Sequence, residues 1–255
     1  MGGLVRNINS YRGTLVMIAM LLVLFELATD IFHWLDPILF PGFSKIGPAL
    51  LESLPQLKEG LISSLGLLVP SYLLALTTGV GMGLVIGRYE PLRKNLMPIF
   101  HGISPIPPTL YIPYALAILP TFWLSSTFII FIGSLWPILM GTIHGVVLLE
   151  GRYLDNARAL ELKGWKMLTR IILPAASPMI FNGAGIALVF AFILLTVAEM
   201  FGAKSGLGYF IQLNADFSEY GRVLAGLIFM STFIVLVMGL FEAIQRRSLH
   251  WTNKR

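Results

Sequence analysis

Long stretches without a single charged residue constrain this chain more than any other feature. The 55 residues from Asn95 to Leu149 contain no Asp, Glu, Lys or Arg, and three further charge-free stretches cover 61–87, 171–198 and 223–241. A helix needs about 20 apolar residues to cross roughly 30 Å of hydrocarbon, so the longest stretch holds two crossings with a turn at 119–121. Only 12% of the residues are charged, against about 25% in a typical soluble domain. The bilayer is therefore the expected solvent.

Together with a shorter apolar segment after Arg12, these stretches predict an all-α polytopic membrane protein with one transmembrane domain over residues 1–255. About six helices are expected, at 12–32, 61–87, 96–119, 122–148, 177–199 and 223–244. The residues before the first helix resemble the start of a signal peptide but lack a small-residue cleavage site, so we expect a retained anchor helix. Leucines and an isoleucine at helical spacing within 46–57 predict a separate short helix at the membrane surface.

The basic residues fall mostly on one side of the predicted helices. If the N-terminus is cytoplasmic, 14 of the 18 Lys and Arg residues lie in inside segments and four lie outside. Because the loops richest in Lys and Arg stay in the cytoplasm, we expect both termini to be cytoplasmic. The net charge of +5 then reflects membrane topology, and nucleic acid is not an expected partner.

Several absences argue against catalysis by this chain. It has no Cys, which removes thiolate metal sites and thiol nucleophiles. Its four His residues are far apart in sequence and show no metal-ligand spacing. The P-loop pattern that cradles nucleotide phosphates does not occur. We therefore expect no catalytic residue, no metal and no cofactor in this chain.

Proline is concentrated in one region, since seven of the 15 prolines lie between residues 96 and 137. An interior proline removes a backbone hydrogen bond and kinks a helix. Irregular backbone at membrane depth is tolerated only where protein or a water-filled cavity surrounds it. The third predicted helix is thus a candidate lining of a transport pathway, with a kinked packing helix as the alternative.

Glycines recur every fourth residue on two of the predicted helices. Small residues at this interval let helix backbones approach closely, so these positions indicate helix packing. They are Gly79, Gly83 and Gly87 on the second helix, and Gly141 and Gly145 on the fourth.

Glu199 ends the fifth apolar stretch. An ionisable group near the bilayer is costly and by default suggests a functional site, where it would contact substrate, an ion or a gating partner. The alternative is a carboxylate at the membrane interface that orders the adjacent glycine-rich turn.

The longest predicted cytoplasmic loop, 150–175, reads EGRYLDNARALELKGWKMLTRIILPA. Leu154, Ala157, Leu160 and Leu168 form one apolar side of a helical segment, and Gly164 interrupts it. A short amphipathic helix on the cytoplasmic face is suited to hold a partner protein.

This loop resembles the EAA loop of ABC importer permease subunits, in which Glu-Ala-Ala is followed after three residues by Gly and later by a proline. Here the corresponding residues are Asp155, Asn156 and Ala157, then Glu161 and, further on, Pro174. The chain is more specifically similar to the nitrate, taurine, alkanesulfonate and bicarbonate group. The strings that carry this similarity are SPIPP at 104–108, WPIL at 136–139, LPAASP at 173–178 and VAEMFGAKSGLGYFI at 197–211.

The loop departs from the family pattern at three positions. Asp155 and Asn156 replace Glu and Ala, and Glu161 stands where the motif glycine turns the chain. Because glycine costs about 1 kcal/mol in a helix interior relative to alanine, we expect Glu161 to extend the first helix of the loop. The break would then move toward Gly164.

The resemblance implies a type I ABC importer permease fold in the bacterial cell (inner) membrane, with the loop forming a coupling helix in a groove of an ATPase. The implied partners are a second copy or a related permease, two ABC ATPase subunits that hold ATP and Mg, and an extracytoplasmic solute-binding protein, with membrane lipid around the helices. The expected ATPase-coupling residues are Asp155, Asn156, Ala157, Leu160, Glu161, Lys163, Gly164 and Trp165. The candidate translocation-pathway residues are Ser104, Pro105, Pro107, Tyr111, Ser134, His144, Asn182 and Glu199. The candidates for an outer gate or receptor contact are Ser205, Gly206 and Tyr209.

The expected substrate is a small anion such as nitrate, a sulfonate (taurine among them) or bicarbonate, because the resemblance implies that cargo. The same architecture in similar permeases carries vitamins, pyrimidine precursors or aromatic acids, which stay open as alternatives. A secondary transporter or channel is the alternative from a different class, and it would need its own coupling-ion site. A membrane scaffold or enzyme subunit that transports nothing is also compatible with the composition.

Overall fold

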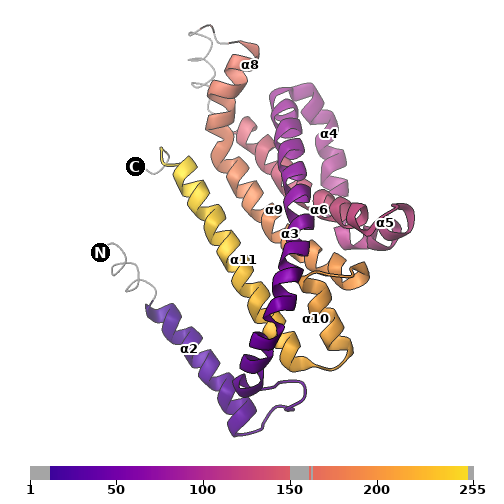
Figure 1. Cartoon of the computed structure of the whole chain (residues 1–255). Helices are drawn as coiled ribbons and strands as arrows, with labels where there is room; N and C mark the ends of the chain where they lie inside the picture. The colour runs from indigo at the N-terminus through magenta and orange to yellow at the C-terminus, as the bar shows by residue number, and fades with distance from the viewer. Residues whose placement is uncertain (1–11, 150–160, 162, 252–255) are drawn as a thin grey trace. The chain divides into compact units, whose positions relative to one another are not determined.

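The computed structural model describes residues 12–149, 161 and 163–251, and within these residues every regular element is helical. The α-helices are α2 (Arg12–Glu26), α3 (Phe43–Arg88), α4 (Glu90–Ile103), α5 (Ile112–Ile118), α6 (Phe122–Val147), α8 (Gly164–Met167), α9 (Leu173–Gly202), α10 (Leu207–Asp216) and α11 (Tyr220–Ser248). Two π-helical turns, η1 (Leu27–Ile31) and η3 (Leu168–Ile172), and one 3-10 turn, η2 (Pro108–Tyr111), connect them. Figure 1 shows their course through the chain.

Four helical segments of the described chain are long and apolar enough to cross a membrane, which confirms the all-α polytopic fold. They are Phe43–Arg88, Phe122–Val147, Gly164–Gly202 and Tyr220–Ser248. The other two of the six expected helices are shorter. The first consists of α2 followed by η1, and the third does not exist as one helix.

The predicted third helix, 96–119, is wrong as a continuous element. Its first half belongs to α4, which ends at Ile103, and its second half forms η2 and α5. Between them lies the SPIPP string, where consecutive prolines remove backbone donors and push the residues before them out of the helical conformation. The proline cluster therefore breaks the helix completely instead of kinking it.

The separate surface helix expected within 46–57 is also wrong, because α3 runs without interruption for 46 residues. The only helix-disfavouring residue between Leu57 and Leu61 is Gly60. One interior glycine costs about 1 kcal/mol, which is too little to end a helix that both flanking segments favour.

The described residues divide into two compact units. The smaller comprises Met1–Lys58 and Phe210–Met230, and the larger comprises Glu59–Tyr209 and Ser231–Arg255. In the smaller unit, the Phe43 N–H donates to Glu26 Oε2 at 3.1 Å, and the rings of Phe25 and Phe43 lie 5.6 Å apart. These contacts join the end of α2 to the start of α3.

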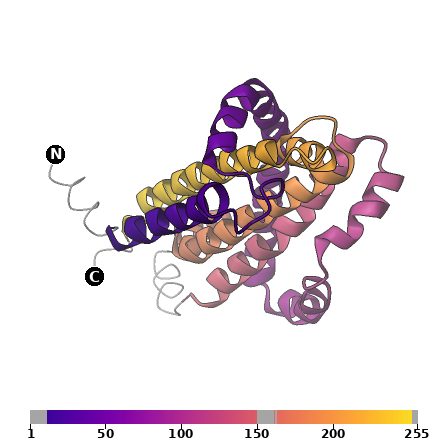
Figure 2. The same ribbon diagram turned by 90° about the horizontal axis from the view of Figure 1, so that it is seen from below.

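The core of the larger unit is built on α6 and α9, which run side by side in both views (Figures 1 and 2). Ile129, Ile130, Leu194 and Leu195 are almost fully buried between them.

The glycines predicted to serve helix packing lie where α3 comes closest to α6. A Cβ on Gly79, Gly83 or Gly87 of α3 would stand 2.5–2.8 Å from Ile138, Thr142 or Val146 of α6, which confirms that this stripe serves helix packing.

Candidate functional site

The α6 and α9 backbones touch where two glycines face each other. A Cβ on Gly141 would stand 2.8 Å from the Met179 carbonyl oxygen and 3.0 Å from the Gly183 Cα. A Cβ on Gly183 would collide with the Pro137 carbonyl oxygen. Because the obstructing atoms belong to the backbone, no side-chain rotation can relieve these contacts. The helices α6 and α9 are thus locked together at this depth.

Glu199 lies near the C-terminal end of α9 and is completely buried. Its Oε1 accepts a hydrogen bond from the Ser64 hydroxyl at 2.6 Å, and its Oε2 accepts one from the Gly208 N–H at 2.7 Å. Ser64 in turn accepts from the Leu207 N–H at 3.0 Å. We call this group of Glu199, Ser64 and the turn 206–208 the Glu199 site.

The turn of the Glu199 site requires glycine. Gly206 has a φ of +133°, a conformation that residues with a Cβ rarely adopt, and a Cβ there would overlap the Glu199 carboxyl group. Gly208 is similarly close, since its Cβ would stand 2.6 Å from the Thr196 carbonyl oxygen. Next to it, the hydroxyl groups of Ser63 and Ser205 are 2.8 Å apart. The carboxyl group therefore ties α3, α9 and the glycine-rich turn into one unit.

The predicted pathway residues lie in different environments. Ser104, Pro105 and Pro107 are in the break between α4 and η2, and the two prolines are exposed. Ser134 is fully buried and donates to the Ala187 carbonyl oxygen at 3.4 Å.

Three further candidates lie on α6, α9 and η2. His144 of α6 and Asn182 of α9 are exposed. Tyr111 of η2 lines an apolar cavity of about 290 Å³ together with Tyr114, Ile118 and Phe128. Among the predicted pathway and gate residues, Glu199 and Gly206 lie against each other in the structure.

Sequence reasoning missed Ser64 and Tyr72, both on α3. Ser64 is fully buried and binds Glu199, while the Tyr72 hydroxyl donates to the Ala184 carbonyl oxygen of α9 at 2.7 Å. A single hydroxyl in a long apolar stretch carries no signal by itself. Each of these two hydroxyl groups binds a partner more than 100 positions away in sequence, so the two contacts are visible only in the folded chain.

Half of the predicted coupling residues, Asp155, Asn156, Ala157 and Leu160, lie outside the described residues. The described half begins at Glu161, whose φ is +54°. The expectation that Glu161 extends the preceding helix is therefore wrong, since this value is left-handed backbone. Glu161 adopts the conformation expected of the glycine it replaces. Gly164, with a φ of +56°, makes a second such turn at the start of α8.

We expect Glu161→Gly to stabilise the protein. A residue with a Cβ pays roughly 1–2 kcal/mol in the left-handed conformation, and glycine pays none of that steric cost. The thermal unfolding midpoint of the solubilised protein should therefore rise. Lys163→Gly is the matched control, because Lys163 has extended backbone (φ −127°) and no strain to release. Equal midpoints for Glu161→Gly and Lys163→Gly would contradict the strain.

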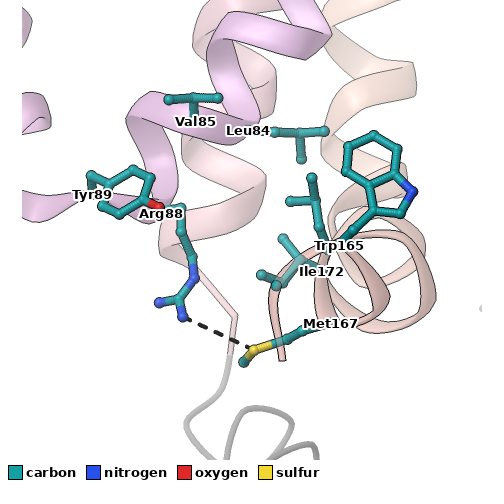
Figure 3. Close-up of a pocket in the computed structure, with 9 residues that line it drawn as sticks. Leu84, Val85, Arg88, Tyr89, Trp165, Met167 and Ile172 are labelled. Carbon is teal, nitrogen blue, oxygen red and sulfur yellow. Dashed lines mark hydrogen bonds between the residues drawn. The ribbon is translucent and has the colours of Figure 1, made fainter. Parts of the chain in front are cut away.

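A cavity of about 430 Å³ lies between the last turn of α3 and the segment from α8 to η3 (Figure 3). Leu84, Val85, Leu168 and Ile172 give it apolar walls. Its polar rim is formed by the Arg88 guanidinium and the aromatic residues Tyr89 and Trp165. It adjoins the described part of the predicted coupling loop.

The described helices define a polytopic helical membrane protein. A family model described as the binding-protein-dependent transport system inner membrane component matches residues 61–250. The chain belongs to this family.

Curated relatives share about 30% of the aligned residues. Over 178 residues the chain is 32% identical to the nitrate import permease protein NrtB of Synechococcus elongatus, covering 70% of this chain and 62% of the relative. It is 32% identical over 188 residues to the bicarbonate transport system permease protein CmpB of a Synechocystis species, covering 70% and 64%. A putative aliphatic sulfonates transport permease protein, SsuC of Bacillus subtilis, is 31% identical, covering 69% and 65%. The chain thus matches slightly under two thirds of the length of these relatives.

Among solved structures, the chain resembles one described as the inward-facing MetNI methionine ABC transporter. The TM-score is 0.64 at 18% identity, and the match covers 77% of this chain and 98% of that one. At this identity the likeness concerns the fold, and it agrees with the type I importer permease architecture expected from the EAA-like loop.

Proposed function

We propose that this chain is the transmembrane permease subunit of an ATP-driven importer and forms the pathway for a small solute delivered by a binding protein. The observation that carries the proposal is the family match over residues 61–250. In this proposal two copies, or this chain and a related permease, work with two ATPase subunits. ATP and Mg are held by those subunits.

The geometry supports a mechanical route for coupling. The segment from Gly164 to Gly202 is one apolar helical segment of 39 residues, about 58 Å long at 1.5 Å per residue. Trp165 stands at its loop end and is 75% exposed, while Glu199 is buried near its other end. A displacement of the loop by the ATPase would therefore reach the Glu199 site through a single element. ATP drives such a change only through its different affinity for the two states.

The π-helical turn η3 lies within this segment, directly after α8. Single π-helical turns often occur at functional sites in helices. In the proposed mechanism η3 sets the angle at which α8 meets α9, and α9 moves together with α6 because the two helices are locked at Gly141 and Gly183. The glycine-rich turn around Ser205 and Tyr209 is the candidate outer gate or receptor contact.

We propose a small anion as the substrate, such as nitrate, a sulfonate or bicarbonate, because relatives at about 30% identity are named for those cargoes. The charge-free stretches leave the membrane interior without Lys or Arg, so no cationic pore selects for anions. Selectivity in this proposal belongs to the binding protein. Vitamins, pyrimidine precursors and aromatic acids are the alternative cargoes.

A secondary transporter would need intramembrane carboxyl groups available for a coupling ion. The Glu199 oxygens accept hydrogen bonds from Ser64 and Gly208, and Glu26 accepts from the Phe43 N–H. These contacts give both groups structural roles and favour the importer over the secondary transporter.

The test is transport by reconstituted vesicles that contain the full chain with or without its ATPase subunits and binding protein. We expect uptake only with the ATPase and ATP present. Ala157→Arg or Leu160→Asp should abolish co-purification with the ATPase, because each places charge on the apolar side of the predicted coupling helix. Gln56→Arg, on an exposed position of α3, is the control and should leave co-purification unchanged. Uptake by the chain alone would overturn the proposal.

A further inference from the structure

The cavity between α3 and α8 brings Arg88, which the proposed import mechanism does not use, next to Trp165 of the coupling loop. Its walls are apolar, yet the Arg88 guanidinium faces it, and the exposed rings of Tyr89 and Trp165 stand at its rim. In Figure 3 the guanidinium is directed toward Met167, Ile172 lies between it and the Trp165 indole, and Leu84 lies above Ile172. One side of the cavity thus offers a cation and the other an apolar surface.

The charge of Arg88 is not balanced by a carboxylate in the described part of the chain. The contact that the structure gives its guanidinium is the Met167 sulfur, at 4.0 Å, and none of the described ion pairs includes it. A thioether is a weak acceptor, so it leaves a guanidinium largely unsatisfied.

The surroundings of Arg88 add positive charge. Arg93 donates to the Gly87 carbonyl oxygen at 2.8 Å, which holds a second guanidinium beside the end of α3. The acid next in sequence, Glu90, is paired with Lys94 at 2.8 Å. That hydrogen bond keeps the pKa of Glu90 below its usual value, so Glu90 brings no free counter-ion. Lys163 and Lys166 flank the cavity-lining residues Gly164 and Trp165.

The position of the cavity at the edge of the predicted membrane-spanning stretch favours a lipid over a soluble ligand. Arg88 is the first charged residue after the 27 charge-free residues 61–87, so it stands where α3 leaves the hydrocarbon. Trp and Tyr are enriched at this level of membrane proteins, and basic pockets between helices on the cytoplasmic side bind anionic headgroups. An apolar wall beside a cation matches an acyl chain beside a phosphate.

We propose that this cavity binds the phosphate headgroup of an anionic phospholipid at Arg88, with an acyl chain along Leu84 and Ile172. The inference rests on the proposed function and on the orientation expected from the distribution of Lys and Arg, which places this end of α3 at the cytoplasmic leaflet. A lipid held there contacts both α3 and α8. Its occupancy would set how freely α8 moves at the start of the coupling segment.

The test is native mass spectrometry of the full-length solubilised protein titrated with phosphatidylglycerol or phosphatidylcholine. We expect the first phosphatidylglycerol to bind more tightly than phosphatidylcholine. Arg88→Gln should weaken that first binding step about fivefold, the effect of one basic residue at a membrane surface, and should weaken phosphatidylcholine less, because the choline cation offsets the charge of its phosphate. Arg88→Lys should retain most of the preference, because it keeps the cation.

Lys94→Gln is the matched control, since it removes the same charge from a residue paired outside the cavity. Equal weakening by Arg88→Gln and Lys94→Gln, or no preference for phosphatidylglycerol in the unaltered protein, would overturn the site. Displacement of the lipid by millimolar inorganic phosphate would assign the cavity to free phosphate and reject the lipid. None of these readouts involves the ATPase, so failure of the lipid site and failure of the import proposal can be told apart.

Discussion

Replacing Glu199 with alanine is expected to destabilise the protein by roughly 2–6 kcal/mol, because two buried donors lose their acceptor at about 1–3 kcal/mol each. The donors are the Ser64 hydroxyl and the Gly208 N–H. With no carboxyl group between them, α3 and the glycine-rich turn are no longer tied to α9. We expect the thermal unfolding midpoint to fall steeply and uptake in reconstituted vesicles to fall with it.

Two matched variants make this expectation specific. Glu199→Gln keeps the shape and one acceptor oxygen, so its unfolding midpoint should lie between those of Glu199→Ala and the unaltered protein. Glu59→Ala removes an exposed carboxyl group from the same region of α3 and should change little. A midpoint for Glu199→Ala that matches that of Glu59→Ala would show that the Glu199 site does not hold these elements together.

The second large effect is expected from Gly183→Ala. The added methyl group would collide with the Pro137 carbonyl oxygen of α6, and overpacking of this kind typically costs about 1–3 kcal/mol. Since backbone must move, α6 and α9 would separate at the point where Gly141 and Gly183 meet. The measurement is the thermal unfolding midpoint, together with co-purification of the ATPase as a readout of coupling.

Gly81→Ala gives the opposite expectation and is the control. A Cβ on Gly81 has no neighbour within 4 Å, and alanine is favoured over glycine in a helix by about 1 kcal/mol. Gly81→Ala should therefore leave stability unchanged or raise it. If Gly183→Ala were equally harmless, the α6–α9 contact would not be as close as the structure describes.

Several elements could be predicted from sequence because their causes are local. The helices α6, α9 and α11 could be predicted from the length of their apolar stretches and the absence of charge. The packing role of the α3 glycines could be predicted from their spacing. The family resemblance followed from short strings such as those at 104–108 and 197–211. These signals are contained within one helix or one loop, so no knowledge of neighbours was required.

Other elements were predicted wrongly because their outcome depends on competing local preferences. The prolines at 105, 107 and 108 were expected to kink a helix and instead end it. The second helix was expected to begin at residue 61, directly after Gly60, but α3 begins at Phe43 and includes this glycine. Glu161 was expected to prolong a helix and is left-handed. The preferences at Gly60 and Glu161 amount to about 1–2 kcal/mol each, which the wider backbone path can outweigh, whereas each interior proline costs a helix about 3 kcal/mol.

By itself, the sequence determined that this chain folds as membrane helices and which family it resembles, because both follow from composition and from patterns within short segments. Only the tertiary structure decided what Glu199 does. Its two hydrogen bonds come from Ser64, 135 positions away, and from the turn nine residues on, and a fully buried carboxyl group must find donors wherever the fold provides them. The same holds for the cavity at Arg88, whose walls come from two helices that are far apart in the chain.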